Sequence, residues 1–147
     1  MEESVRRMIV RFVINSEPRG KQRPRVFNNR HTGKSQTITP KETVSYENLV
    51  RWTYANTLGC GMLEGALRMD VMAYYSIPKS TPKGKRQDMI DGKILHTKRG
   101  DIDNVIKLIA DALNGIAYKD DGQIAEVYAK KMYSENPRVE VTIQELD

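Results

Sequence analysis

The sequence contains only one cysteine, Cys60, among its 147 residues. An intramolecular disulfide is therefore excluded, and the two histidines lie too far apart for a zinc-site spacing. The apolar run over residues 8–14 is interrupted by Arg11 and is too short for a signal peptide or a membrane span. We therefore expect a soluble protein of a reducing compartment, the cytoplasm.

Acidic residues are fewer than basic residues: 24 Lys and Arg against 19 Asp and Glu give a net charge of +5. A basic balance favours polyanionic partners, such as nucleic acid or an anionic membrane surface. Residues 18–41 contain no acid at all, and their seven bases are Arg19, Lys21, Arg23, Arg25, Arg30, Lys34 and Lys41. This stretch is a solvated loop or a ragged hairpin, and its unrelieved positive charge favours contact with phosphates. The DNA-binding candidates are Arg19, Lys21, Arg23 and Arg25.

Four stretches have the pattern of β-strands. Residues 8–14 are rich in β-branched side chains, and residues 67–77 alternate apolar with polar positions. Residues 123–134 and 138–146 also alternate and are separated by a turn that contains Pro137, which predicts an antiparallel hairpin.

Two further stretches predict helices before the acidic segment. Thr39 is expected as an N-cap, with Pro40 at the first helical position and Glu42 completing a capping box, and this helix is expected to end near Leu58. A short helix is expected between residues 82 and 92. The predicted fold class is α/β of the α+β type, with a mixed β-sheet packed with helices in a single domain over residues 1–147.

Carboxylates gather in residues 100–122, which read GDIDNVIKLIADALNGIAYKDDG. Asp103 precedes a run with helical spacing of apolar residues, so its carboxylate can cap a helix. On a helical wheel Lys107, Asp111 and Asn114 share a narrow polar stripe with Asp103. Surface pairs of Lys107 with the two aspartates would contribute only about 0.3–0.5 kcal/mol each. A helix cap with a solvated polar face is therefore one interpretation of this segment.

A metal site is the second interpretation. If the segment starts in an extended conformation, the carboxylates of Asp101 and Asp103 project to the same side. Two close carboxylates repel unless a cation neutralises them, and Mg²⁺ prefers oxygen ligands. Either Asp120 or Asp121 adds a third carboxylate if the chain folds back. A cation held beside a basic, phosphate-binding surface is what phosphodiester hydrolysis needs, and Lys107 can stabilise the charge that develops.

The segment HTKRGDIDNVIKLIADALNGIAYKDDGQI, with SEPRGKQRPRV upstream and YYSIPKS between them, resembles the RusA family of Holliday junction resolvases. These endonucleases are common on bacterial and prophage genomes. The resemblance runs in order from about Ile14 to the C-terminus. It depends on the combination D-x-D-N-x-x-K followed by D-D-x-Q-[IV].

The resemblance implies a homodimeric, Mg²⁺-dependent endodeoxyribonuclease, with Mn²⁺ as a substitute ion, that resolves four-way DNA junctions in recombination and repair by paired nicking. Its catalytic residues would be Asp101, Asp103, Lys107 and Asp121, and the three aspartates would bind the metal. Asn104 and Asp120 would support them, because Asp121 holds the second place of the aspartate pair. The expected partners are branched DNA and a second copy of the chain, with no membrane and no small-molecule substrate, and the expected location is the cytoplasm, at the nucleoid.

Gly100 departs from the family pattern, because many members have proline before the first aspartate. A glycine is expected to loosen the backbone there. Two other functions stay open at this level. One is a non-catalytic, basic DNA-binding protein whose acidic patch engages a protein partner, and the other is a nuclease that prefers flaps or replication forks.

Overall fold

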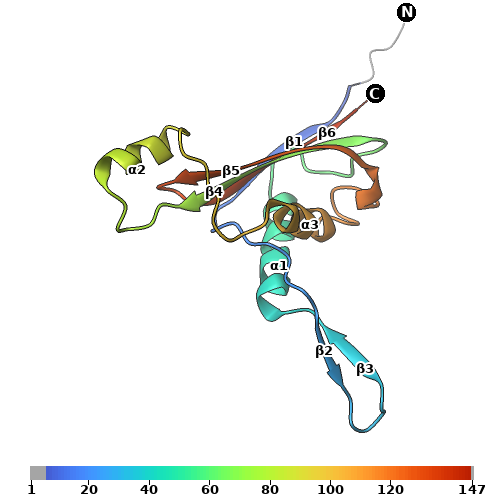
Figure 1. Ribbon diagram of the computed structural model, residues 1–147. Coiled ribbons are helices and arrows are strands. Elements are labelled where there is room, and N and C mark those ends of the chain that lie inside the picture. Colours follow the sequence, from blue (N-terminus) through green and yellow to red (C-terminus); the bar gives the residue numbers. More distant parts are fainter. Residues whose placement is uncertain (1–5, 147) are drawn as a thin grey trace, which may run out of the picture.

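The computed structural model of the protein describes residues 6–146, apart from the side chain of Arg25 (Figure 1). Its elements in chain order are β1 (Ile9–Ile14), β2 (Arg25–Asn28), β3 (Ser35–Ile38), α1 (Lys41–Ala55), β4 (Leu67–Ser76), α2 (Lys83–Ile90), α3 (Ile102–Ala112), the 3-10 helix η1 (Asp121–Gln123), β5 (Ile124–Ser134) and β6 (Arg138–Glu145). Four strands form one sheet in the order β1-β6-β4-β5, and β2 pairs with β3 in a separate hairpin. The sheet is mixed, because β4 pairs parallel with β5 and antiparallel with β6.

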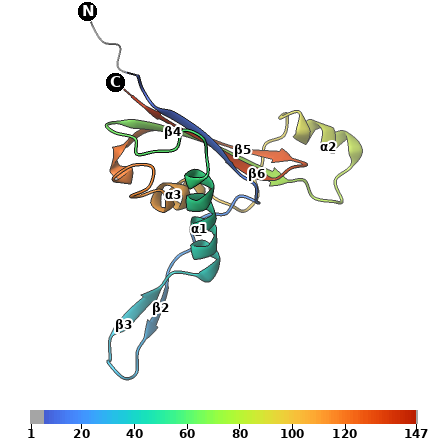
Figure 2. The same ribbon diagram turned by 180° about the vertical axis from the view of Figure 1, so that it is seen from behind.

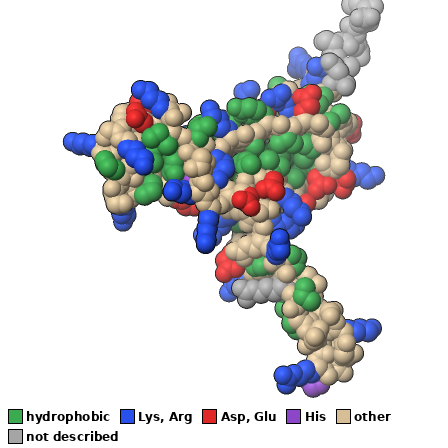
Figure 3. All heavy atoms as spheres, in the orientation of Figure 1, with side chains coloured by type: hydrophobic (Ala, Val, Ile, Leu, Met, Phe, Trp, Pro, Cys, Tyr) green, Lys and Arg blue, Asp and Glu red, His purple; other side chains and the backbone are tan. Residues whose placement is uncertain are grey.

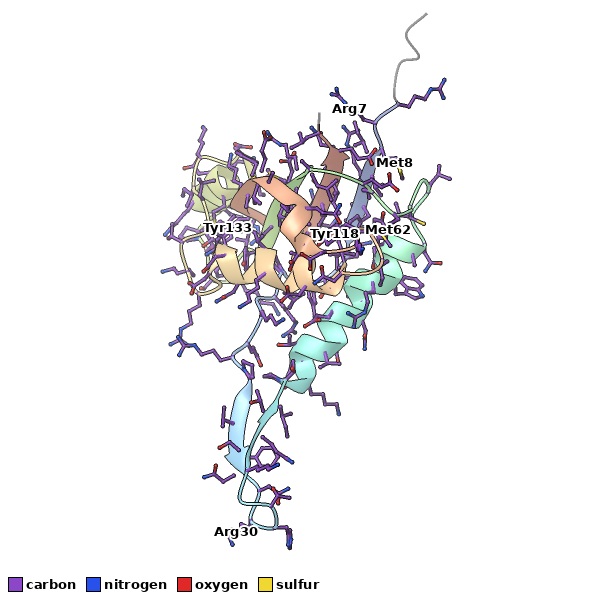
Figure 4. The ribbon with its side chains drawn as sticks, turned by 90° about the vertical axis from the view of Figure 1, so that its right-hand side faces the viewer. Arg7, Met8, Arg30, Met62, Tyr118 and Tyr133 are labelled. Carbon is purple, nitrogen blue, oxygen red and sulfur yellow. The ribbon has the colours of Figure 1, made fainter. Side chains whose placement is uncertain are left out.

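The helices α1 and α3 lie on one face of the sheet (Figures 1 and 2). The buried core fills the space between them and includes Val50 and Tyr54 of α1, Leu108 and Ile109 of α3, and Val71 of β4. The helix α2 lies beyond one end of the sheet, and the β2–β3 hairpin projects away from the body of the molecule (Figure 1). Figure 4 shows Arg30 at the far end of this hairpin.

The α+β class, the mixed sheet, and the strands β1 and β4 are confirmed. Along β4, residues of one parity are buried and those of the other are partly exposed, as the alternating sequence predicts. The short helix between residues 82 and 92 is α2. The basic stretch over residues 18–41 contains the β2–β3 hairpin.

The predicted antiparallel hairpin of the last two strands is wrong. The strands β5 and β6 lie on opposite sides of β4, which pairs with both of them. Alternation specifies which face of a strand is buried, but it does not specify which strand lies alongside. The connection over residues 135–137 therefore crosses the end of β4 instead of forming a hairpin turn.

The predicted capping box of the first long helix is also wrong. Pro40 occupies the N-cap of α1 with an extended ψ of 143°, and the cap makes no side-chain hydrogen bond. A proline with that ψ has not entered the helix, so α1 starts one residue later than predicted. The helix ends at Ala55, before the predicted end at Leu58.

The start of the acidic segment is a helix terminus instead of a strand. Asp101 is the N-cap of α3 and keeps an extended ψ of 127°, while Asp103 already lies in the first helical turn. The apolar residues that follow form an amphipathic face, and burial of that face fixes the start of the helix. Among residues 6–146, no helix combines the length and apolar character needed to cross a membrane.

Candidate active site

The helix α3 positions most of the candidate residues. Val105, Leu108 and Ile109 are fully buried, because apolar residues recur at helical spacing on this side. Asp103 and Lys107 lie on the opposite side and are exposed. The hydroxyl of Tyr118 donates a hydrogen bond of 2.6 Å to the carbonyl oxygen of Ala110, which further fixes the helix. The polar stripe is therefore carried by a rigid, well-anchored element.

Asp101 and Asp103 present exposed carboxylates at the N-terminus of α3. Within the described part of the chain, neither side chain takes part in a hydrogen bond or an ion pair. The positive end of the helix dipole favours negative charge at this position. Carboxylate oxygens are also the donors that Mg²⁺ prefers, so these two residues fit a divalent cation chemically.

Gly100 turns the chain into α3 with a φ of +117°, a conformation that favours glycine. A Cβ at this position would lie 2.8 Å from the hydroxyl oxygen of Tyr75. Proline, with φ fixed near about −65°, cannot adopt this conformation. Gly100 is thus required by the close packing in front of Asp101.

His96 holds the same loop on the sheet. Its ring stacks on Tyr75 of β4, with 3.7 Å between centroids and 12° between planes, and it also contacts the ring of Tyr133 on β5. The backbone N–H of His96 donates to the carbonyl oxygen of Lys131 at 3.4 Å. Burial and the nearby Lys131 ammonium lower the pKa of His96. His96 is therefore a buried residue that packs between the loop and the sheet.

A basic cleft of about 450 Å³ opens beside Asp101. Its lining includes the cations Lys21, Arg23 and Arg99 together with Asp101 and Asn104. Cations and an unpaired carboxylate thus face one open space that is large enough for a phosphate group. Arg99 is a lining residue that the sequence analysis did not identify as a candidate.

A close crossing of two segments builds this cleft. The backbone N–H of Lys21 donates to the carbonyl oxygen of Asn104 at 3.0 Å. A Cβ at Gly20 would lie only 2.9 Å from the Cβ of Asn104, so a larger residue would push the segment away from α3. The glycine therefore brings the start of the basic stretch against the first turn of α3.

Lys21, Asp111 and Asp121 form a charged cluster near the other end of α3. The Lys21 ammonium donates a hydrogen bond to a carboxylate oxygen of Asp111. Burial acts to raise the pKa of Asp111, but the hydrogen bonds with Lys21 and Asp121, together with the positive charges of Lys21 and Lys107, outweigh it and the pKa is lowered. A hydrogen bond with Asp111, reinforced by burial, raises the pKa of Asp121. Asp121 is therefore the member of this carboxylate pair that holds a proton more readily.

The two neighbouring aspartates at the end of the segment have different environments. Asp120 is the N-cap of η1, where its side chain accepts a hydrogen bond of 2.9 Å from the N–H of Gly122. The N–H of Asp121 donates to the side-chain oxygen of Asn114 at 2.8 Å, which holds Asp121 next to the end of α3. Asp120 thus has a local structural role, while the Asp121 carboxylate is directed towards Asp111.

The candidate carboxylates lie along α3 in two groups. Asp101 and Asp103 occupy its first turn, whereas Asp121 meets Asp111, which follows Asp103 by about 12 Å of helix at a rise of about 1.5 Å per residue. In the portion covered by residues 6–146, no three acidic, histidine or cysteine side chains gather as a metal cage. Lys107 lies between the two groups on the exposed side.

Fold and site together define a small α+β protein that presents a row of carboxylates next to a cationic cleft. The model of the RusA endodeoxyribonuclease family matches residues 15–144, so the chain belongs to this family. A Bacillus subtilis (strain 168) protein described as uncharacterised protein YqaN is 33% identical over 139 residues, which cover 93% of this chain and 96% of that protein. Family membership indicates an endodeoxyribonuclease.

Sequence reasoning placed Asp111 only in the polar stripe and did not identify it as a partner of Asp121. Its expected i,i+4 pair with Lys107 is not among the ion pairs of the described residues, although Lys107 contributes to lowering the pKa of Asp111. The ion-pair partner of Asp111 is instead Lys21, which lies 90 residues earlier in the sequence. Spacing along one helix cannot reveal a contact of this kind.

Proposed function

We propose that this protein is a Mg²⁺-dependent endodeoxyribonuclease that resolves four-way DNA junctions by paired nicking. The observation that carries the proposal is the cleft in which Lys21, Arg23 and Arg99 face the unpaired carboxylate of Asp101. Membership of the RusA family supports the reaction class.

The proposed metal ligands are Asp101, Asp103 and Asp121. When bound, a divalent cation polarises the phosphate and lowers the pKa of an attacking water. The first two residues offer hard oxygen donors at the positive end of α3. Asp121 is proposed as the third ligand from its place in the family motif, although its carboxylate lies next to Asp111, and Asp120 would hold the η1 segment through its cap.

Lys107 is proposed as the catalytic cation. It lies one helical turn after Asp103 and is exposed, so its ammonium can reach a phosphate that lies along α3. A cation at this position stabilises the negative charge that builds on the phosphate oxygens during cleavage. Asn104 supports the site through its backbone carbonyl oxygen, which accepts a hydrogen bond from the backbone N–H of Lys21.

DNA is proposed to run along the cleft and the exposed β2–β3 hairpin. Arg19 and Arg23 are exposed at the base of this hairpin, and Arg30 lies at its far end (Figure 4). Lys21 acts mainly through its ion pair with Asp111. Arg25, also proposed as a contact, has a side chain outside the described part of the structure. The proposed enzyme is a homodimer, because symmetric cuts in two strands need two equivalent sites.

The decisive experiment is cleavage of a synthetic four-way junction with and without Mg²⁺, comparing the wild type with Asp103→Asn. Loss of a metal ligand is expected to lower the cleavage rate by at least about 100-fold, because cation catalysis contributes several kcal/mol. Junction binding is expected to stay or to tighten, because a negative charge near phosphates is removed.

Asp91→Asn is the matched control, because it removes the same charge from an exposed residue at the end of α2. This variant should cleave like the wild type. Cleavage that is equal in Asp103→Asn and the wild type would contradict the proposed site. Faster cleavage of a flap or a fork than of the four-way junction would contradict the proposed substrate.

A further inference from the structure

The strand β5 forms an open edge of the sheet. It pairs with β4 on one side and is the terminal strand in the order β1-β6-β4-β5. Val127 and Tyr128 in its first half are 49% and 48% exposed. Figure 3 shows hydrophobic side chains gathered over this strand. A long edge strand with exposed apolar residues is a template for pairing with another strand, so a monomer would be expected to protect it.

The second half of this edge is already covered. The loop that contains His96 donates its backbone N–H to the carbonyl oxygen of Lys131, and the Lys131 ammonium donates to the carbonyl oxygen of Lys98 at 3.0 Å. The backbone groups of alternate residues in a strand point to the same side. The N–H and C=O groups of Val127 and Ala129 therefore point to the same outer side as those of Lys131, away from β4. The first half of β5 thus keeps a pairing edge that the loop does not reach.

We propose that β5 pairs with β5 of a second copy of this chain, antiparallel and centred on Tyr128. The proposal rests on the proposed function in its expectation of a homodimer, and it names the interface. Val127 then exchanges backbone hydrogen bonds with Ala129 of the partner subunit. Tyr128 lies opposite the partner's Tyr128, at a position where the two strands approach most closely.

Charge complementarity favours this register over the registers that are shifted by one residue. With Tyr128 on the two-fold axis, Glu126 lies opposite the partner's Lys130, and the symmetry creates the same pair a second time. Glu126 is more than half exposed and already lies 3.6 Å from Arg68 on the neighbouring strand, so its carboxylate lies on the accessible face. A shift of the axis by one residue places Glu126 opposite the partner's Tyr128 or Met132, and both ion pairs are lost.

The arrangement also orients the candidate sites. A two-fold axis perpendicular to the sheet leaves both copies of α3 on the same face of one continuous sheet. The helix α3 packs next to β5, and Ile106, which is partly buried, belongs to the apolar cluster between them. Both rows of carboxylates are then presented to one side of the dimer. A branched DNA with two equivalent strands can contact both rows at once in such an arrangement.

A cysteine scan along β5 tests the register directly. In a Cys60→Ser background, which removes the single native thiol, Tyr128→Cys is expected to form an intersubunit disulfide under mild oxidation. Directly opposed residues in a non-hydrogen-bonded pair have Cα atoms about 4.5 Å apart, within the range of a disulfide. Glu126→Cys is the matched control, because position 126 lies opposite position 130 of the partner subunit, so the two introduced cysteines are offset by four residues along the strands. Crosslinking of Glu126→Cys but not of Tyr128→Cys would overturn the register.

A charge exchange tests the interface without new covalent bonds. Glu126→Lys and Lys130→Glu each place like charges opposite one another twice, and each is expected to weaken dimerisation at least about tenfold by light scattering. The double variant restores both pairs and should dimerise like the wild type. Unchanged dimers in the single variants, or a double variant as weak as the singles, would overturn the proposal.

The junction assay separates this proposal from the function on which it rests. A wild type that is monomeric, yet cleaves junctions with Mg²⁺, would overturn the interface and the expected homodimer but leave the proposed nuclease activity standing. A dimer crosslinked through Tyr128→Cys that cleaves no DNA would support the interface and count against the function.

Discussion

Neighbouring aspartates of identical chemistry have different surroundings in this protein. The carboxylate of Asp120 caps η1, and that of Asp121 meets Asp111. The sequence could identify the pair but not divide the roles, because both positions follow a turn whose direction depends on Asn114. The capping contact now supports Asp121 as the proposed ligand.

Asp120 and Asp121 are expected to respond oppositely to substitution. Asp120→Ala should lower the free energy of unfolding by about 1 kcal/mol, because the cap of η1 is lost. Asp121→Asn should keep that free energy, because it removes a carboxylate that faces Asp111, and should lower cleavage by at least about 100-fold. Urea titration and the junction assay measure the two effects. A stable Asp120→Ala variant that has lost all cleavage, beside an active Asp121→Asn variant, would reverse the assignment.

His96 makes the stability of the protein depend on pH. Its folded-state pKa is lowered by burial and by Lys131, so the unfolded chain takes up a proton first as the pH falls. Its contribution is complete above about pH 6.5, the ordinary value for histidine, and the free energy of unfolding falls below that pH. One proton limits the slope to about 1.4 kcal/mol per pH unit.

Urea titrations between pH 5 and 8 measure this dependence. His96→Phe keeps a ring on Tyr75 and should flatten the profile in this window. Glu17 opposes the effect and Lys98 adds to it, so neither should be changed in the same variant. His31→Ala is the control, because His31 is exposed and its removal should leave the slope in place. Identical slopes in wild type and His96→Phe would show that another group controls the profile.

The β2–β3 hairpin is the element with the least support from the core. Val26 and Ile38 are 68% and 51% exposed, and a two-stranded hairpin is only marginally stable on its own. Its sequence nevertheless contains basic residues and no acid, which is consistent with a partner that supplies negative charge. A two-stranded ribbon also has the width to enter the major groove of DNA.

Neutralising the tip of this hairpin should weaken DNA binding and its dependence on salt. The double variant Arg30→Gln and Lys34→Gln is expected to lower the slope of log affinity against log salt by up to about 2, near 0.9 per lost phosphate contact. Fluorescence anisotropy with a four-way junction, recorded between about 50 and 300 mM salt, measures this slope.

The matched control is Arg6→Gln with Arg11→Gln, which removes the same charge from exposed residues. Arg11 lies on the face of β1 opposite the buried residues. A slope equal to that of the wild type in the hairpin variant, or an equal decrease in the control, would contradict a role of the hairpin in DNA binding.

Individual elements were more predictable than their contacts. The strand β4 and the amphipathic helix α3 follow from periodicity alone, because burial of one face dominates both. The start of α1 was missed because Pro40 keeps an extended backbone, so the N-cap lies at Pro40 and not at the predicted Thr39. The sequence also identified the acidic row but could not place Lys21 or Asp121 against it, since those contacts depend on how distant segments cross.

At the scale of the whole molecule, the order of strands was the least predictable feature. Adjacent strands with a short connection usually form a hairpin, and β5 and β6 do not, because β4 separates them. What decides the order is the match of buried faces over the whole sheet, a property to which every element contributes. The family match over residues 15–144 covers β4, β5 and nearly all of β6, whereas β1 (Ile9–Ile14) lies before the matched region.

The place of β6 has a consequence for synthesis of the protein. It lies between β1 and β4, so the last of the described strands, Arg138–Glu145, is an interior strand that joins β1 to the rest of the sheet. Until β6 is made, β1 has no neighbour in the sheet and the edge of β4 that pairs with β6 stays open. A chain that has not yet formed β6 therefore has an incomplete sheet, and incomplete sheets of this kind are prone to aggregation.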